Sequence, residues 1–271
     1  MSRLLLSLPL CLLLAFDGTS RPLPPAQAES AAGGEGTPIA DAESLERLVK
    51  TDPVAFMQAC LRRYDRDVKG YRCAFVKQER LGSKLQRSEI VDICFREEPF
   101  SVLFDWKEGA RLASKVLYVK GQNGEQMLVR PSGWRGALVS VVSRDPEGSD
   151  AKESSRYPIT DFGIKRGMLR AIAAWSAAQK EGSLKYQYGG KRKIAEAGDR
   201  LCYVLHRLDY RQPEEDGITD AVMYYDVETW LQVGSTLKGA EGQLIGDYWF
   251  RDIKLNPDFP PDTFTRAGLT K

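Results

Sequence analysis

His206 is the only histidine in the chain, and it is the residue best suited to proton transfer near neutral pH. It lies within the run Leu201–Arg207, which reads as a strand. A catalytic histidine needs a positioned nucleophile and a carboxylate that orients the ring. No sequence spacing around His206 suggests either partner. The simpler interpretation is a structural histidine on a strand.

Carboxylates are plentiful, with 37 Asp and Glu in the chain, but they do not form a recognisable catalytic pair. Glu97–Glu98, Glu214–Asp216 and the Asp258/Asp262 pair stand beside Pro or Gly, which indicates solvated turns. A glycosidase needs only two carboxylates held apart by the fold, and residue types alone leave that alternative open. We predict no catalytic residues and no enzyme activity, with a cell-envelope hydrolase as the competing hypothesis.

Cysteine usage argues against metal and redox chemistry. The chain has five cysteines, and none of them stands in a C-x-x-C or Cys/His spacing. We therefore predict no metal site and no cofactor. Three arrangements stay open: a Cys73–Cys94 disulfide across a hairpin, a Cys60–Cys73 disulfide, or buried thiols. Strand alternation counts against the first, because it places Cys73 and Cys94 on different faces.

The charges are nearly balanced, with 39 basic and 37 acidic residues, and both signs are mixed along the chain. The short basic run 191–193 has no wider basic stripe beside it, so it reads as a solvated turn and no nucleic-acid partner is predicted. Further basic residues alternate along the expected strands and are predicted to face solvent: Arg72, Lys77, Arg96, Lys115, Arg130 and Arg207.

The N-terminus has the layout of an export signal. Arg3 is followed by the apolar run Leu4–Phe16, which is shorter than the roughly 20 residues that span a bilayer. We predict a signal peptide over residues 1–28, a disordered linker over 29–44 and one folded domain over 45–271. An uncleaved anchor, or cleavage nearer Ser20, is the alternative. The predicted location is the periplasm or cell envelope.

Hydrophobic periodicity predicts two helices among many strands. Asp52 and Pro53 open the first helix as cap and first residue. Residues 162–180 form the second, which interrupts the strands midway. Strands are expected over residues 71–80, 86–96, 100–106, 112–119, 125–130, 137–143, 184–188, 193–196, 200–210, 221–226, 231–238 and 244–255, and a polar loop over 144–155.

These serial hairpins favour an up-and-down meander. The predicted fold is mostly β (α+β). It is a single open antiparallel half-barrel of about ten or eleven strands, with an N-terminal helix and a second helix plugging or lidding the concave face.

Aromatic residues gather on alternate positions of these strands and on the second helix. An open barrel that its own side chains do not fill leaves an apolar cavity. The predicted ligand-binding residues are Phe104, Trp106, Tyr118, Met168, Trp175, Tyr225, Tyr248 and Phe250. Packing of the same residues into an ordinary core is the competing interpretation.

Several segments also resemble a known family, the uncharacterised bacterial domain of unknown function numbered 1571. Through it, the chain resembles in architecture the LolA/LolB-like lipoprotein-carrier superfamily. The segments that carry the resemblance are Tyr71–Arg80 with Gly82, Glu98–Val102 leading to Trp106, Arg156–Ile159 before Gly163, Tyr225–Thr229, Leu244–Tyr248 and Asp252–Pro257. The resemblance implies an open β-barrel with a hydrophobic cavity lidded by helices, whose characterised members carry lipoprotein acyl chains through the periplasm.

The function predicted from the sequence is therefore that of an exported, non-enzymatic protein that binds a lipid or the acyl chain of a lipoprotein. Its expected partners are such a chain and an envelope protein. The alternative is a structural or protein-interaction module whose half-barrel is filled by its own helix and binds no ligand.

Overall fold

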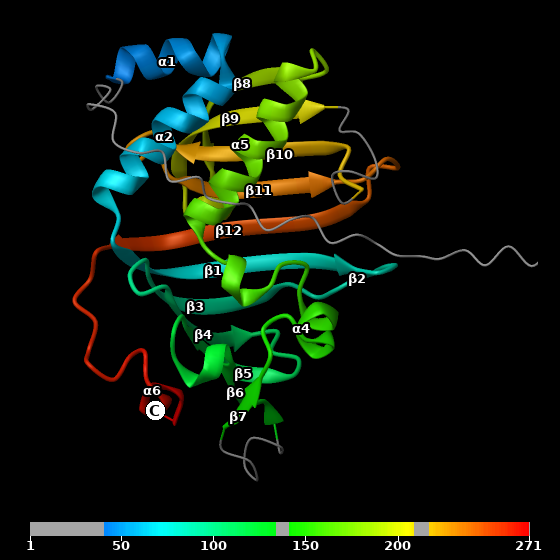
Figure 1. The fold of residues 1–271 in the computed structure, drawn as a ribbon. Coiled ribbons are helices and arrows are strands. Elements are labelled where there is room, and N and C mark those ends of the chain that lie inside the picture. The colour runs from blue at the N-terminus through cyan, green and yellow to red at the C-terminus, as the bar shows by residue number, and fades with distance from the viewer. Residues whose placement is uncertain (1–40, 134–140, 209–216, 271) are drawn as a thin grey trace, which may run out of the picture. The chain divides into compact units, whose positions relative to one another are not determined.

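Antiparallel pairing joins all the strands of the described residues into one open sheet (Figure 1). The computed structural model describes residues 41–133, 141–208 and 217–270. Contacts divide the chain into Met1–Pro38, which lies outside the described residues, and the unit Ile39–Lys271 treated below. The strands are β1 (Gly70–Leu81), β2 (Lys84–Leu85), β3 (Glu89–Arg96), β4 (Ser101–Glu108), β5 (Ala113–Val119), β6 (Met127–Pro131), β7 (Val142–Arg144), β8 (Lys185–Ile194), β9 (Arg200–Leu208), β10 (Asp220–Asp226), β11 (Gln232–Lys238) and β12 (Leu244–Leu255).

The sheet consists of two meanders that meet in the middle. Its order is β7-β6-β5-β4-β3-β1-β12-β11-β10-β9-β8, with β2 paired to β1 outside this path. Phe75 of β1 lies opposite Val91 of β3 on one side and opposite Phe250 of β12 on the other. The predicted single open antiparallel, mostly β fold is confirmed.

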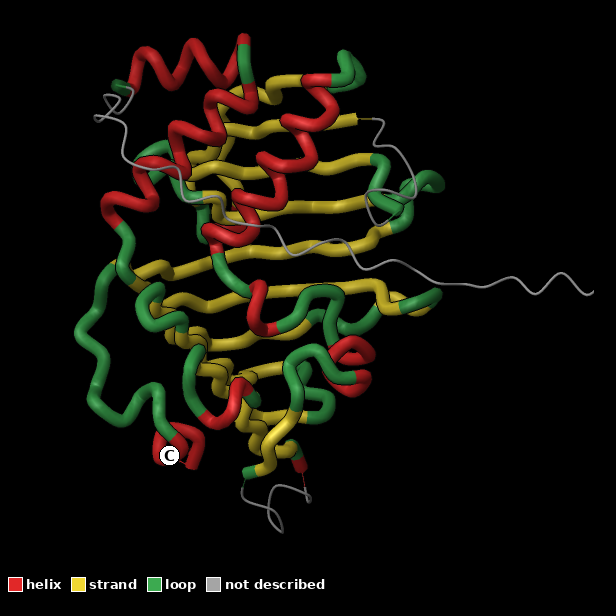
Figure 2. Tube along the Cα trace, in the orientation of Figure 1, coloured by secondary structure: helices red, strands yellow, loops and turns green. Residues whose placement is uncertain are grey.

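Two long helices cover the β8–β12 half of the sheet on one side (Figure 2). We call this side, along the whole sheet, the inner face. The helices are α1 (Ala42–Thr51), α2 (Pro53–Asp67), α4 (Ser149–Ser154), α5 (Ile164–Lys180) and α6 (Arg266–Thr270). Asp52 caps α2 as predicted, accepting a hydrogen bond from the backbone N–H of Ala55 at 3.0 Å. In α5, the buried residues recur at helical spacing (Ile164, Met168, Ala171, Trp175 and Ala178). The predicted helix over the sheet is therefore present.

A shorter element covers the inner face near β1, β3 and β4. It comprises α4, the loop after it and a single 3-10 turn at Ile159–Asp161, and it ends at Gly163, where α5 begins. We call residues 149–163 the covering segment. The sequence predicts an irregular polar loop over 144–155, and α4 corrects that prediction. A helix forms there because residues 149–154 contain no Pro or Gly that would stop it.

The end of the chain covers the outer face of the sheet near β3, β4, β5 and β6. Arg72 lies opposite Cys94, on the face away from Tyr71 and Phe95. There the guanidinium of Arg96 stacks over the ring of Phe264, 4.7 Å from its centroid. A second hydrophobic core, separate from the one on the inner face, lies here. It contains Leu103, Leu117, Val119, Leu128, Val141, Phe264 and Leu269.

Some boundaries differ from prediction. One N-terminal helix was expected, but there are two, and α1 begins at Ala42, inside the segment expected as linker. The strands expected at 184–188 and 193–196 are one strand, β8, with an irregularity between Tyr188 and Lys191 where Gly190 has φ +82°. In the strand expected at 137–143, residues 137–140 lie outside the described residues.

Two basic side chains predicted to face solvent are buried. Lys77 is 6% exposed and Arg207 is 2% exposed. The alternation of β1 explains Lys77, because it shares a face with Tyr71, Cys73 and Phe75. A charge can lie on a buried face when neighbouring side chains compensate it. We therefore expect carboxylates or hydrogen-bond acceptors around the Lys77 ammonium group.

Candidate functional site

The site begins with a patch of aromatic rings on the inner face. Phe75, Phe95, Phe104 and Phe250 come from four neighbouring strands and are all buried. One ring of the covering segment, Phe162, contacts all four, with centroid distances of 5.2, 6.2, 4.7 and 6.0 Å in that order. Phe162 itself is only partly buried. The patch is therefore covered on its solvent side by Phe162, a ring that is itself only partly buried.

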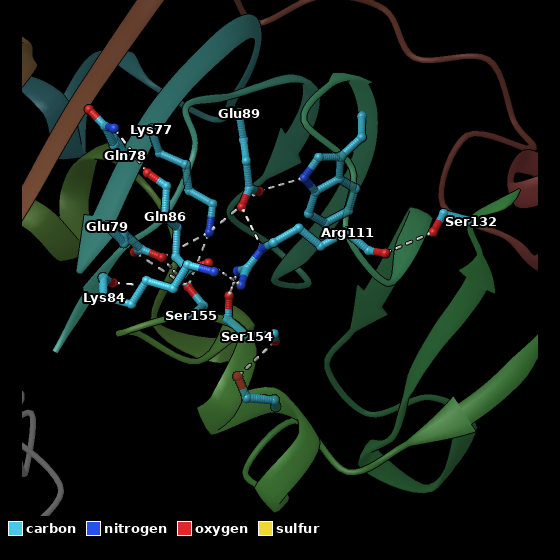
Figure 3. Close-up of polar contacts among 12 residues, drawn as sticks. Lys77, Gln78, Glu79, Lys84, Gln86, Glu89, Arg111, Ser132, Ser154 and Ser155 are labelled. Carbon is cyan, nitrogen blue, oxygen red and sulfur yellow. Dashed lines mark hydrogen bonds and ion pairs between the residues drawn. The ribbon is translucent and has the colours of Figure 1, made fainter. Parts of the chain in front are cut away.

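A cluster of charges lies on the same face beside these rings (Figure 3). Lys77, Glu79 and Glu89 are 6%, 4% and 4% exposed. The Nζ of Lys77 lies 3.0 Å from Oε2 of Glu79 and 3.8 Å from Oε2 of Glu89. Burial of a charge is costly unless an opposite charge and hydrogen bonds compensate it. Here both conditions are met.

Two aromatic residues join the cluster to the patch. The indole N–H of Trp106 donates to Glu89 at 2.7 Å, while its ring lies 5.5 Å from that of Phe104. The hydroxyl of Tyr248 donates to Glu79 at 3.0 Å, while its ring lies 6.3 Å from that of Phe75. Each residue therefore has its apolar part in the patch and its polar end in the cluster.

Burial raises the pKa of the Tyr248 phenol well above its ordinary value, and the nearby Glu79 carboxylate raises it further. The phenol therefore stays protonated at physiological pH. It acts as a hydrogen-bond donor to Glu79 and carries no charge into the cluster.

Arg111 connects the cluster to the covering segment. Its Nε lies 3.2 Å from Oε1 of Glu89, and its terminal nitrogen donates to the backbone carbonyl of Ser154. Next to it, the hydroxyl of Ser155 lies 3.3 Å from Oε2 of Glu79 and 3.4 Å from Nζ of Lys77. The covering segment therefore contacts the sheet through polar groups at Ser154 and Ser155, through the ring of Tyr157, which lies 6.2 Å from that of Tyr248, and through the ring of Phe162.

The predicted ligand-binding residues fall into two groups. Four of them, Phe104, Trp106, Tyr248 and Phe250, gather at the aromatic patch. Tyr118 lies outside the patch, and its ring is 5.9 Å from that of Phe100. The other predicted residues are fully buried at the helix-covered half of the face: Met168, Trp175 and Tyr225. In that group, the ring of Phe56 on α2 packs 5.3 Å from Tyr225.

Sequence reasoning missed the charged half of the site and the ring that covers the patch. Lys77, Glu79, Glu89, Arg111 and Phe162 were not predicted. A signal was present in β1, where the inward positions continue from the apolar residues up to Phe75 directly into Lys77 and Glu79. Charges at inward positions of a strand indicate a buried polar site.

The cysteines are all thiols in the described part of the chain. Cys73 lies opposite Ile93 on the inner face, whereas Cys94 lies opposite Arg72 on the outer face. The Cys73–Cys94 disulfide considered above is therefore wrong, because the sheet separates the two sulfur atoms. No group of His, Cys, Asp and Glu able to hold a metal ion occurs among the described residues.

His206 has a carboxylate partner after all. Its Nε2 lies 2.6 Å from Oδ2 of Asp220 on the neighbouring strand. Across residues 41–133, 141–208 and 217–270, no hydroxyl or thiol forms a hydrogen bond with the ring, so the nucleophile of a catalytic triad is missing there.

A separate hollow of about 410 Å³ opens near the turn between β10 and β11. Its buried carboxylate, Asp226, is already satisfied by Arg200 at 3.1 Å and by the backbone N–H of Thr229 at 2.7 Å. Its lining shares no residue with the aromatic patch or the charged cluster.

Together these features describe an open β-sheet protein with an amphipathic site under a covering segment. The chain belongs to the family described as "Protein of unknown function (DUF1571)", whose model matches residues 68–268. No curated protein matches the chain. No helix among the described residues is both long and apolar enough to cross a membrane.

Three solved structures are similar in fold. A DUF1329 family protein from Desulfovibrio piger is 13% identical, with 81% of this chain and 100% of that chain covered and a TM-score of 0.39. MucB in the MucA/MucB complex of Pseudomonas aeruginosa is 17% identical, with 79% of this chain and 60% of that chain covered and a TM-score of 0.44. A putative outer membrane lipoprotein-sorting protein domain from Vibrio parahaemolyticus is 12% identical, with 85% of this chain and 100% of that chain covered and a TM-score of 0.37.

Proposed function

We propose that this protein is exported and binds the acyl chain of a lipid or lipoprotein, without catalysis, on the inner face where Phe162 now lies. The observation that supports the proposal is the difference in burial at the aromatic patch. Four rings of the sheet are buried, yet Phe162, the ring that contacts all four, is only partly buried and belongs to a short segment rather than to a long helix. Such a ring is replaceable by another apolar group.

The energies favour replacement by a long chain. Burial of one Phe side chain contributes about 1.5–3 kcal/mol, and each buried methylene contributes about 0.8 kcal/mol. A chain that buries about ten methylenes therefore contributes about 8 kcal/mol. This gain exceeds the contribution of one Phe side chain, and the difference is available to offset the cost of association and the loss of the polar contacts at Ser154 and Ser155.

The alternative is a protein-interaction module whose sheet is filled by its own side chains. The full burial of Met168, Trp175 and Tyr225 against the helix-covered half supports it. The two hypotheses differ in one physical respect, which is whether Phe162 leaves the patch to admit a ligand.

Lipid extraction and mass spectrometry of the purified protein, combined with titration of a fluorescent fatty-acid probe, test the proposal. We expect a co-purifying acyl lipid and saturable probe binding. Phe162→Ala opens the patch and should strengthen probe binding. Phe259→Ala is the matched control, because Phe259 is a half-buried ring that packs on Phe264 at the outer face. Absence of lipid and of probe binding in both the wild type and Phe162→Ala would favour the interaction module.

Export is proposed from Arg3 and the apolar run Leu4–Phe16. The mass of the protein purified from its own cell envelope tests it, with a start at residue 29 expected. A chain that retains Met1 in the cytoplasm would contradict export. The absence of catalysis is tested by His206→Ala, which we expect to leave the cellular phenotype unchanged.

A further inference from the structure

The charged cluster and the aromatic patch form one continuous surface with an apolar end and a polar end. Trp106 and Tyr248 span the boundary, because each packs its ring in the patch and donates a hydrogen bond into the cluster. A surface of this kind matches an amphiphile, with its chain on the rings and its headgroup among the charges.

Apart from Arg156 of the covering segment, whose charge acts on the nearby Tyr248, the cluster is balanced in charge. Lys77 and Arg111 provide two positive charges, and Glu79 and Glu89 provide two negative ones, within ion-pair distance of one another. A further ion placed among these side chains would leave a net charge in a region from which water is largely excluded. Such a charge is strongly unfavourable. The cluster therefore disfavours a headgroup that carries a net charge.

The covering segment places uncharged groups at this end. The Ser154 carbonyl oxygen accepts a hydrogen bond from Arg111, and the Ser155 hydroxyl lies between Glu79 and Lys77. At the other end of the same segment, Phe162 lies on the rings. The covering segment thus offers a carbonyl and a hydroxyl to the charges and an apolar group to the rings, which are the three kinds of group that an acylglycerol carries.

We propose that the headgroup end of this site accepts a neutral glyceryl ester of the monoacylglycerol type, and that residues 154–162 occupy its place when it is absent. This proposal rests on the proposed acyl-chain binding. The ester carbonyl takes the place of the Ser154 carbonyl at Arg111. A glycerol hydroxyl takes the place of the Ser155 hydroxyl between Glu79 and Lys77. The acyl chain takes the place of Phe162.

Competition among ligands with one shared chain tests the proposal in the wild-type protein. Displacement of a bound fluorescent acyl probe is measured with 1-monopalmitoylglycerol, methyl palmitate, palmitate and palmitoyl lysophosphatidylglycerol, each below its aggregation concentration. We expect 1-monopalmitoylglycerol to bind at least about tenfold more tightly than the two anionic ligands, because these bring a net charge into the cluster. Methyl palmitate should have an intermediate affinity, because it is neutral but lacks the glycerol hydroxyls that hydrogen-bond to the charged groups.

A variant locates the effect. Arg111→Gln should weaken 1-monopalmitoylglycerol about tenfold relative to hexadecane, which has no headgroup, because both ligands gain equally from the loss of the Arg111–Ser154 hydrogen bond. Arg66→Gln is the control, since Arg66 pairs with Asp67 on the exposed side of α2, and it should change neither. If Arg111→Gln does not fold, as judged by thermal unfolding, the wild-type ranking decides by itself.

The outcomes separate the two proposals. Equal binding of all the palmitoyl compounds, or preference for an anionic one, overturns the headgroup assignment and leaves acyl-chain binding intact. Failure of the acyl probe itself to bind saturably, together with failure of every compound including hexadecane to bind, overturns acyl-chain binding and the headgroup assignment with it.

Discussion

Phe162 meets Phe104 edge to face, with ring centroids 4.7 Å apart and an angle of 73° between the ring planes. Phe104 belongs to β4, whereas Phe162 is followed directly by Gly163 and the first turn of α5. Through this contact, and through those of Phe162 with Phe75 and Phe95, the segment that leads into α5 is linked to the strands of the other half of the sheet. Movement of the covering segment away from the patch must break these contacts and bend the chain at Gly163.

Gly163 is the first place at which this link can be tested. Its φ of +126° and ψ of 161° lie in a region that is almost restricted to glycine. A Cβ there would also lie 3.2 Å from the ring of Phe95 and 3.3 Å from the Tyr71 hydroxyl. We expect Gly163→Ala to lower the free energy of unfolding by about 1–3 kcal/mol, measured by chemical denaturation.

Gly167 provides a control of opposite sign. It lies within α5, and a Cβ there would have its nearest contact at 3.8 Å, in the side chain of Gln232. Gly167→Ala should raise the free energy of unfolding by about 0.5–1 kcal/mol, because alanine favours the helix. A loss of stability in both variants would mean that the helix tolerates no added methyl group and that Gly163 has no special role.

The buried ion cluster predicts a large asymmetry between lysines. Lys77→Met leaves Glu79 and Glu89 facing each other without their shared cation, and we expect a loss of about 3–5 kcal/mol in the free energy of unfolding. Lys107 also pairs with two carboxylates, Asp105 and Asp92, but its side chain is 48% exposed. Lys107→Met should therefore cost less than about 1 kcal/mol. Similar losses in urea denaturation for both variants would contradict the burial of the cluster.

The thiols are expected to react slowly in the native protein. Burial raises the pKa of Cys60 and Cys73, and it raises that of Cys202 to about 12. Little reactive thiolate is therefore present at pH 8. Cys94 is only partly buried and should be the first to react with a thiol reagent. With Cys11 replaced by Ser, denatured protein that has not been reduced should yield four thiols. A count of two would restore the Cys60–Cys73 disulfide.

Stability should decrease at alkaline pH. Burial raises the pKa of Cys73, Tyr71 and Tyr248 well above the ordinary values. In the unfolded chain these groups lose their protons near pH 8.5 for Cys and near pH 10 for Tyr, while the folded chain retains them. The folded state then binds more protons, so the free energy of unfolding falls as pH rises through this range. Urea midpoints from pH 8 to pH 10.5 measure it, and an unchanged midpoint would contradict the prediction.

The fold could be predicted further than the site. Alternation in segments such as Glu89–Arg96 reports which face of a strand is buried, and serial hairpins leave few topologies besides a meander. The site depends on contacts between distant segments. Arg111 is a loop residue between β4 and β5, and nothing local indicates that it donates to Ser154. The same holds for Phe162, which the sequence placed at the start of a helix and the structure places on a patch built from four strands.

The pairing of β1 with β12 has a consequence for how the protein folds. Residues 70–81 acquire their second neighbour only from residues 244–255, near the far end of the chain. Contacts between such distant segments carry a large loop-closure cost and slow the folding of a domain. Until β12 arrives, β1 is an exposed strand edge, which is a template for pairing with other chains. A polypeptide truncated before residue 244 should therefore self-associate, and a holdase should bind it in preference to the full-length protein.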